Sequence, residues 1–211
     1  MSGAALRRGD DGRVRCGWCT PDPAYERYHD EEWGLPVADD TRLFEKLALE
    51  GFQAGLSWLT ILKKRERLRA VFDGFEPARV ARFTPADVDR LLGDPGIVRH
   101  RGKIEAVVHN AGRTLALQDR HGSLAAFVWS FEPAAAERPA RLDPATAATL
   151  TESRASRALA GALRREGWRF VGPTTAYAFM QAMGLVNDHP QGCHRRAPVA
   201  AARVAFAPPG R

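Results

Sequence analysis

Residues 41–75, TRLFEKLALEGFQAGLSWLTILKKRERLRAVFDGF, repeat apolar side chains at helical spacing, and this pattern constrains the fold more than any other. The apolar positions are Leu43, Phe44, Leu47, Trp58, Ile61, Leu62, Leu68, Val71 and Phe72. Separations of three, four and seven residues place side chains on one face of a helix. Gly51 and Gly55 interrupt the repeat, which predicts helices over 41–50 and 57–72 joined by a tight turn. The core of such a chain must lie between helices.

The rest of the chain also favours helices and carries few strand signals. We predict further helices over 83–94, 99–118, 123–131, 153–168 and 173–185. Thr84, Pro85 and Asp87 have the pattern of a capped helix start. The last of these segments, PTTAYAFMQAMGL, is apolar enough to lie in the core, whereas the Pro/Ala-rich residues 133–149 are expected to form a loop. The sequence therefore predicts an all-α protein.

A length of 211 residues suits one ordinary domain, and we expect that single domain over 15–194. The polar residues 1–14 are expected to form a disordered leader, and the Ala/Pro/Arg-rich residues 195–211 a disordered tail. No apolar run approaches the length of a membrane span, and the start lacks the apolar segment of a signal peptide. We therefore expect no membrane association.

Net charge and cysteine content limit which partners and which cellular compartment are plausible for the protein. The formal net charge of +6 favours a polyanion, with nucleic acid as one candidate beside an acidic membrane surface or an acidic protein. Much of the arginine could equally be solvated helix surface. Three cysteines are too few for a disulfide framework in a chain of this size, which indicates a reducing cytoplasm.

Cysteine and histidine residues near the two ends of the chain suggest a metal site. His189 and Cys193 are four residues apart, and a structural zinc takes four ligands, usually sulfur and imidazole. The other two ligands could be Cys16 and Cys19, or Cys16 and His29. Chance occurrence of these residues is the plain alternative. A thioredoxin-like redox pair is disfavoured because no βαβ pattern surrounds Cys16 and Cys19.

The segment LLGDPGIVRHRGKIEAV, residues 91–107, predicts two helices joined by a glycine-containing hairpin. Arg99, His100, Arg101 and Lys103 lie at the start of the second helix, where backbone N–H groups attract anions. Such a hairpin would grip a phosphate backbone without reading base sequence. The alternative is a simple helix turn with basic surface residues.

Glu50 ends an apolar helical stretch, and a carboxylate in apolar surroundings is costly unless it is paired or functional. Aromatic residues that cluster around it in sequence include Trp18, Tyr25, Tyr28, Trp33 and Trp58. Flat aromatic walls with one carboxylate are what a pocket for an extruded base requires. Each aromatic taken singly is more often a core residue, and Glu50 could be a surface acid at a helix end.

Several longer motifs together resemble the DNA-3-methyladenine glycosylase I family. They are CGW at residues 16–18, YHDEEWG at 28–34, LEGFQAGLSW at 49–58, GIVRHRGKI at 96–104 and FMQAMGLVNDH at 179–189. The resemblance runs from Cys16 to Cys193, with the motifs in the same order and at compatible spacing. It implies an all-α helix-hairpin-helix glycosylase whose N- and C-terminal segments are tied together by one structural zinc ion.

The resemblance also implies roles for single residues. Zinc would be bound by Cys16, His29, His189 and Cys193, with Cys19 outside the ligand set. Glu50 would hydrogen-bond the flipped adenine, Tyr25 and Tyr28 would line the pocket, Trp58 would stack on the base, and Trp18 would lie close to the same wall. DNA would be contacted by Gly55, Gly96, Arg99, Arg101, Gly102 and Lys103. Leu56 would enter the gap left by the flipped nucleotide.

The implied activity is hydrolysis of the N-glycosidic bond of 3-methyladenine in double-stranded alkylated DNA. Methylation leaves the base cationic, so the bond is already weak and the base departs neutral from an oxocarbenium-like sugar. We expect a monomer that works in the cytoplasm, on the nucleoid, and releases 3-methyladenine. Two other classes remain open: a non-catalytic zinc-tied DNA-binding module, and a zinc hydrolase, which would need only three protein ligands.

Overall fold

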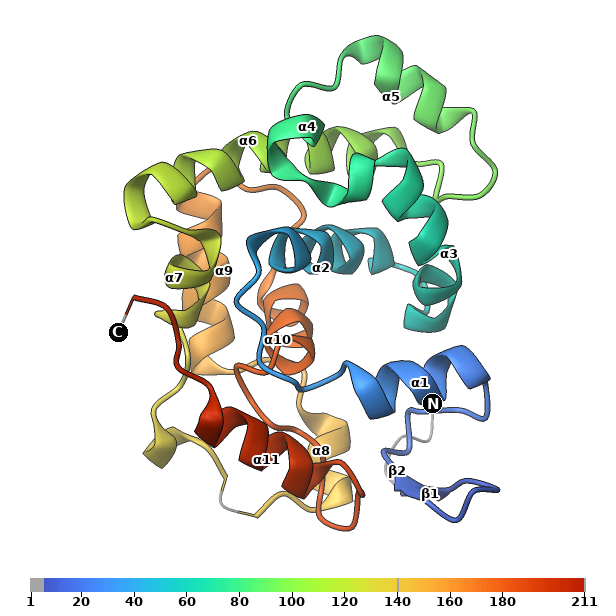
Figure 1. Ribbon diagram of the computed structural model, residues 1–211, viewed down its shortest axis with the longest axis vertical. Helices are drawn as coiled ribbons and strands as arrows, with labels where there is room; N and C mark the ends of the chain where they lie inside the picture. The colour runs from blue at the N-terminus through green and yellow to red at the C-terminus, as the bar shows by residue number, and fades with distance from the viewer. Residues whose placement is uncertain (1–5, 140, 211) are drawn as a thin grey trace.

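The computed structural model describes residues 6–139 and 141–210, and most of them are helical (Figure 1). Helix α2 (Asp40–Gln53) and helix α3 (Trp58–Val71) confirm the pair predicted from the apolar repeat. Gly51, predicted to interrupt the first helix, instead lies inside α2, where a β-carbon would come 3.5 Å from Cβ of Phe170. The turn is made by Gly55, whose φ of +81° is open to glycine without strain.

The remaining elements follow in chain order. They are β1 (Arg7–Arg8), β2 (Val14–Arg15), α1 (Pro23–Glu31), the 3₁₀ helix η1 (Asp73–Phe75), α4 (Pro77–Val80), α5 (Pro85–Leu92), α6 (Arg101–His121), α7 (Leu124–Trp129), the 3₁₀ helix η2 (Ala135–Glu137), α8 (Pro144–Thr149), α9 (Arg154–Arg165), α10 (Pro173–Ala182) and α11 (Arg196–Ala205).

The five later helices predicted from sequence are present as α5, α6, α7, α9 and α10. Thr84 and Asp87 form the expected capping box at the start of α5. Residues 133–149 were expected to form a loop, but they include η2 and α8. Asp143 accepts a hydrogen bond from the backbone of Thr146 and so starts α8 at Pro144.

The predicted disordered leader is wrong for residues 6–14. Strands β1 and β2 pair antiparallel, with Arg7 opposite Arg15. Arg15 is only 2% exposed and forms ion pairs with Asp11 at 2.6 Å and Asp30 at 2.7 Å, which fasten the hairpin to α1. Residues 1–5 lie outside the described part of the chain.

The predicted disordered tail is also wrong for residues 195–210. Helix α11 buries Val199, and Phe206 packs on Trp129 with ring centroids 4.6 Å apart. Arg203 forms an ion pair with Glu132 at 2.7 Å, which fixes the helix to the segment after α7. These long-range contacts leave no signature in the local composition. Residue 211 is not described.

Helix α2 runs through the middle of the molecule and contacts α3, α6, α7 and α10 (Figure 1). Every residue from Leu43 to Phe52 is therefore buried, including three charged ones, Glu45, Lys46 and Glu50. Such groups are tolerated inside a protein only when they are paired. Among the described helices, none is both long and apolar enough to cross a bilayer.

Candidate functional site

A cavity of about 210 Å³ opens beside the C-terminal half of α2. Its lining residues are Trp18, Tyr25, Tyr28, Trp33, Lys46, Glu50, Gln53, Trp58, Ala178 and Gln181. The structure thus brings together all five predicted pocket residues. It also places there Trp33, which the sequence offered as a further aromatic wall, and adds four residues that sequence reasoning did not assign to the pocket: Lys46, Gln53, Ala178 and Gln181.

Helix caps place the aromatic walls of this cavity. Asp22 accepts a hydrogen bond from the backbone of Ala24 at 3.0 Å and starts α1, which carries Tyr25 and Tyr28 one turn apart. Ser57 accepts from the backbone of Thr60 at 3.1 Å and makes Trp58 the first residue of α3. Two local sequence signals therefore set the position of three pocket side chains.

The aromatic rings contact one another as well as the cavity. The ring centroids of Trp18 lie 5.2 Å from Tyr25 and 5.0 Å from Trp33, and those of Tyr28 and Trp58 are 5.3 Å apart. Tilted and edge-on pairs at such separations are favourable and hold the rings in place. The walls are therefore preformed around the cavity.

Glu50 is 5% exposed and is paired with Lys46, one helical turn earlier on α2. The Lys46 ammonium lies 2.7 Å from a Glu50 carboxylate oxygen, donates to the Tyr28 hydroxyl at 2.9 Å and lies 3.3 Å from the Trp58 ring centroid. Burial lowers the pKa of Lys46, although Glu50 opposes this shift. The four-residue spacing of the two was the signal in the sequence that could have found Lys46.

Both tyrosines of the pocket stay protonated at neutral pH. Burial, reinforced by the charge of Glu50, raises the pKa of Tyr28 well above its usual value. Burial likewise raises the pKa of Tyr25 to about 12. The cavity therefore offers two phenolic hydroxyls and one carboxylate to whatever enters it.

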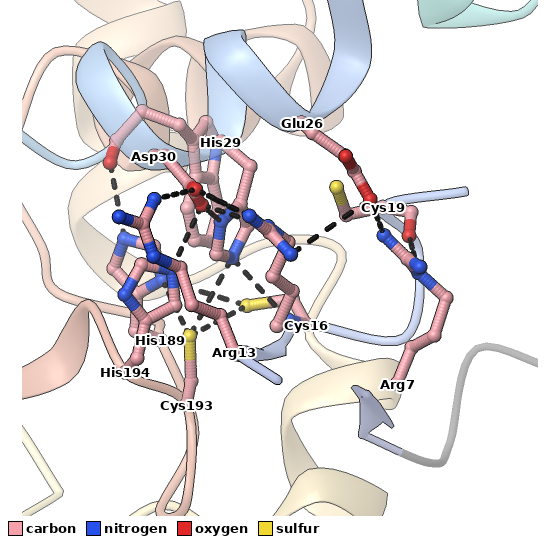
Figure 2. A network of polar contacts seen from close by, with 12 residues as sticks. Arg7, Arg13, Cys16, Cys19, Glu26, His29, Asp30, His189, Cys193 and His194 are labelled. Atoms are coloured by element: carbon pink, nitrogen blue, oxygen red, sulfur yellow. Dashed lines mark hydrogen bonds and ion pairs between the residues drawn. The ribbon is translucent and has the colours of Figure 1, made fainter. Parts of the chain in front are cut away.

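A second cluster joins the two ends of the chain (Figure 2). Cys16, His29, His189 and Cys193 are all buried, and their ligand atoms lie within 4.8 Å of one another. The sulfurs of Cys16 and Cys193 are 3.8 Å apart, and that of Cys193 is 3.5 Å from His29 Nε2 and 3.3 Å from His189 Nδ1. Cys16 Sγ is 3.5 Å from His189 Nδ1.

These separations match the edges of a tetrahedral zinc site. With Zn–S bonds of about 2.3 Å and Zn–N bonds of about 2.0 Å, the edges are about 3.8 Å between sulfurs and about 3.5 Å between sulfur and nitrogen. Of the two ligand sets left open by the sequence, the one with His29 converges. Cys19 is buried away from the cluster, beside Arg7 and Glu26 in Figure 2.

Outer hydrogen bonds turn both histidines of the cluster toward the sulfurs. His29 Nδ1 donates to Asp30 at 2.7 Å, and His189 Nε2 donates to the Trp33 carbonyl at 3.0 Å. The remaining nitrogen of each ring is then an acceptor that points to the centre, as a metal ligand requires. His194 contacts Asp30 at 2.8 Å and therefore lies outside the ligand set.

The predicted hairpin connects α5 to α6 over residues 93–100. Lys64 of α3 donates to the carbonyls of Pro95 and Gly96 at 3.2 and 3.1 Å and holds the turn. A β-carbon on Gly96 would lie 2.7 Å from Cγ of Arg67, so the turn packs closely on α3. Arg99 and Arg101 are exposed, although Arg101 pairs with Asp89 at 2.6 Å. Gly102 is partly exposed in the first turn of α6.

Lys103 does not lie where the sequence predicted. It is 7% exposed, and its ammonium donates to the carbonyls of Phe52 and Ala54 at 2.9 and 2.6 Å. The last carbonyls of a helix lack partners within the helix and attract a cation. The ammonium of Lys103 therefore holds the end of α2 and does not point to the surface, where we expected a basic side chain for DNA.

Two exposed apolar side chains lie near this end of α2. Leu56, in the turn after Gly55, is 42% exposed, and Phe170 is 43% exposed with a φ of +55°. Phe170 packs against His100, the N-cap of α6, with ring centroids 6.2 Å apart. Leu56 was predicted to contact DNA, whereas Phe170 was not. The left-handed backbone conformation of Phe170 could not be predicted from the sequence.

A larger cavity of about 590 Å³ lies between the 133–155 segment, α10 and α11. Its lining includes one aromatic ring, Tyr177, whose hydroxyl donates to the buried carboxylate of Asp188 at 2.6 Å. In the smaller cavity, five aromatic residues line the wall together with Glu50. The smaller cavity beside α2 carries the more specific chemistry.

Comparison with known proteins agrees with this geometry. The family model described as methyladenine glycosylase matches residues 18–196. DNA-3-methyladenine glycosylase 1 of Escherichia coli K12 is 49% identical over 180 residues, which cover 85% of this chain and 95% of that protein. DNA-3-methyladenine glycosylase of Haemophilus influenzae is 45% identical over 181 residues, covering 85% and 96%.

Solved structures give the same result. A crystal structure of 3-methyladenine DNA glycosylase I superposes with a TM-score of 0.80 at 50% identity, covering 85% of this chain and 98% of that one. A structure of the Staphylococcus aureus 3-methyladenine DNA glycosylase I, described as the structural basis of 3-methyladenine recognition, superposes with a TM-score of 0.79 at 40% identity, covering 84% and 93%. The chain belongs to the methyladenine glycosylase family.

Proposed function

We propose that this protein is a monofunctional DNA glycosylase that flips 3-methyladenine out of alkylated double-stranded DNA and hydrolyses its N-glycosidic bond. The observation that carries the proposal is a buried carboxylate, Glu50, facing a preformed aromatic cavity of about 210 Å³. Drug-sized ligands occupy pockets of about 300–1,000 Å³, so a smaller cavity suits a single base. A DNA-binding module without catalysis would need no such cavity.

The chemistry requires little acid catalysis from the protein. The methylated base carries a positive charge in DNA and leaves as a neutral molecule, while positive charge develops on the sugar. Trp58 and the tyrosines offer electron-rich faces to the base. Glu50 accepts a hydrogen bond from the amino group of adenine, a donor that guanine lacks at that edge. The main tasks of the site are then to extrude the nucleotide from the duplex, to fit the methylated base and to recognise the edge of adenine.

Cys16, His29, His189 and Cys193 are proposed to hold one structural zinc ion. Two sulfurs and two imidazole nitrogens form a complete tetrahedral set, which leaves no position for substrate or water. The ion would join Cys16 and the α1 residue His29 to the segment before α11, across almost the whole chain. A zinc hydrolase is therefore disfavoured, because it would need an open coordination position.

The hairpin would contact the DNA backbone, and the exposed apolar side chains at the end of α2 would insert into the duplex. Arg99 and the first backbone N–H groups of α6 are proposed to hold phosphate. Leu56 would fill the space left by the flipped base, with Phe170 beside the hairpin as a further apolar contact. The role of Lys103 in this arrangement is to hold the turn that carries Leu56, by capping α2.

The test of the function is release of bases from methylated DNA by the wild-type protein. We expect free 3-methyladenine as the main product, identified by chromatography of the released bases. A protein that binds this DNA but releases no base would contradict the proposal and favour the non-catalytic binding module.

Arg99 and Lys103, two of the basic residues predicted to contact DNA, should differ in their response to salt. Arg99→Ala is expected to weaken DNA binding by removing one phosphate contact, which lowers the slope of log affinity against log salt by about 0.9. Lys103→Met is expected to leave that slope unchanged, because its ammonium is turned inward. The measurement is fluorescence anisotropy of labelled DNA over a series of salt concentrations. Equal slopes for Arg99→Ala and wild type would show that Arg99 does not contact a DNA phosphate.

A further inference from the structure

Lys46 is a buried charge that the base-excision chemistry described above does not use. An ammonium group has three N–H donors and no acceptor, so each of its contacts has a defined direction. One donor faces Glu50 Oε1 at 2.7 Å, one faces the Tyr28 hydroxyl at 2.9 Å, and the group lies 3.3 Å from the Trp58 ring centroid. Carboxylate, phenol and indole of the same cavity thus converge on one nitrogen.

The contact with Tyr28 decides which way the phenol can donate. Its oxygen accepts from Lys46, and Lys46 is its one hydrogen-bond partner among the residues that the structure describes. Because the phenol stays protonated, its own hydrogen is left for a molecule that enters the cavity. Tyr28 is therefore set as a donor toward the cavity.

The contact with Glu50 provides its counter-ion. Its buried carboxylate would be costly without a counter-ion, and Lys46 supplies that positive charge within the same helix. The neighbouring ionic groups already balance each other, since Glu32 forms a two-fold contact with Arg65 at 2.6 and 2.8 Å. One oxygen of Glu50 is engaged by Lys46, and the other remains an acceptor toward the cavity.

We infer that Lys46 is a positioning residue for the base pocket: its ammonium holds the Glu50 carboxylate in place as an acceptor and Tyr28 as a donor. Adenine presents an amino donor and the N7 acceptor side by side, which complements this pair, whereas guanine presents two acceptors there. The inference rests on the proposed function of the pocket. In this inference, selectivity for adenine depends on Lys46, which contacts Glu50 and Tyr28 and does not itself contact the edge of the base.

The test compares Lys46→Met with wild type, using free 3-methyladenine as the probe and quenching of tryptophan fluorescence as the signal. The variant should bind at least about tenfold more weakly, because the Glu50 carboxylate loses the partner that holds its orientation. Tyr28 also loses the donor that leaves its own hydrogen for the ligand.

Further variants separate this role from simple packing. Lys46→Ala leaves space for a small amine, so propylammonium should restore binding, whereas tetramethylammonium, which has no N–H donor, should not. Lys46→Gln keeps N–H donors without charge and provides a second folded protein should the methionine variant not fold. Lys63→Met is the matched control, because Lys63 is half-exposed and pairs with Asp22 at the protein surface.

The outcomes distinguish the two proposals. Release of 3-methyladenine by wild type, with a Lys46→Met affinity equal to wild type, would overturn the role of Lys46 and leave the proposed function intact. Equal rescue by both amines would likewise reduce Lys46 to a filler of space. A wild-type protein that neither binds nor releases 3-methyladenine would refute the proposed function, and this inference with it.

Discussion

Glu50→Gln is expected to lower the rate of 3-methyladenine release about 100- to 1,000-fold, the loss typical of removing one preorganised electrostatic contact from an active site. The glutamine has almost the size of the glutamate but carries no charge to complement a cationic base. Its amide can also present a donor where the adenine amino group needs an acceptor. The measurement is single-turnover release of 3-methyladenine from methylated DNA with enzyme in excess.

The same variant has a defined effect on stability. Breaking a buried ion pair by removing one partner costs about 3–5 kcal/mol when the other charge stays behind. Here the remaining charge is Lys46, whose pKa is already lowered by burial, so it can lose its proton and reduce that cost. We therefore expect a folded protein with unchanged zinc content. A variant that releases the base at the wild-type rate would show that Glu50 is not the recognition acid.

His29→Ala is expected to abolish zinc binding and to lower the melting temperature, whereas Cys19→Ser should change neither. A clip between Cys16 and Cys193 closes a loop longer than 100 residues, and loss of such a constraint costs about 5 kcal/mol in the chain-entropy estimate. For a domain of this size, that free energy corresponds to a decrease of about 10–20 °C. Metal content and thermal unfolding of the purified variants measure the two effects.

Chelation supplies the control for this prediction. Removing zinc from wild type should reproduce the melting temperature of His29→Ala, and adding a chelator to His29→Ala should change nothing further. Loss of zinc in Cys19→Ser, with retention in His29→Ala, would instead select the ligand set that pairs Cys16 with Cys19. The distance of Cys19 from the cluster argues for the first result.

The helices could be predicted because their signals are local. The apolar repeat of α2 and α3, and the capping box before α5, depend on residues within one or two turns of each other. Gly51 shows the limit of such reasoning. Its absent side chain looks like a helix break, but in the structure it makes room for Phe170, more than a hundred positions later in the chain.

The pocket was predicted less completely than the helices. Aromatic residues and Glu50 were found because their types are unusual in such density and because the motifs resemble a known family. Lys46 was overlooked because a lysine in a helix is ordinarily a solvated surface residue. Only the packing of α3 on α2, together with Tyr28 from α1, encloses it and makes it part of the site.

The terminal segments show the same division. Their polar and Ala/Pro-rich composition predicts disorder, yet Arg15 and Val199 are buried by contacts with distant parts of the chain. By itself the sequence determined the helices, the candidate ligands and the type of base pocket, because hydrophobic periodicity, capping and ligand chemistry act over short distances. The chemistry of the ligands left His29 and Cys19 open, the family resemblance implied His29, and the structure places His29 within 3.5 Å of Cys193. Tertiary structure alone decided that Lys103 points inward and Lys46 into the pocket. Each depends on which helices pack together, and burial reverses the usual environment of a charged or polar side chain.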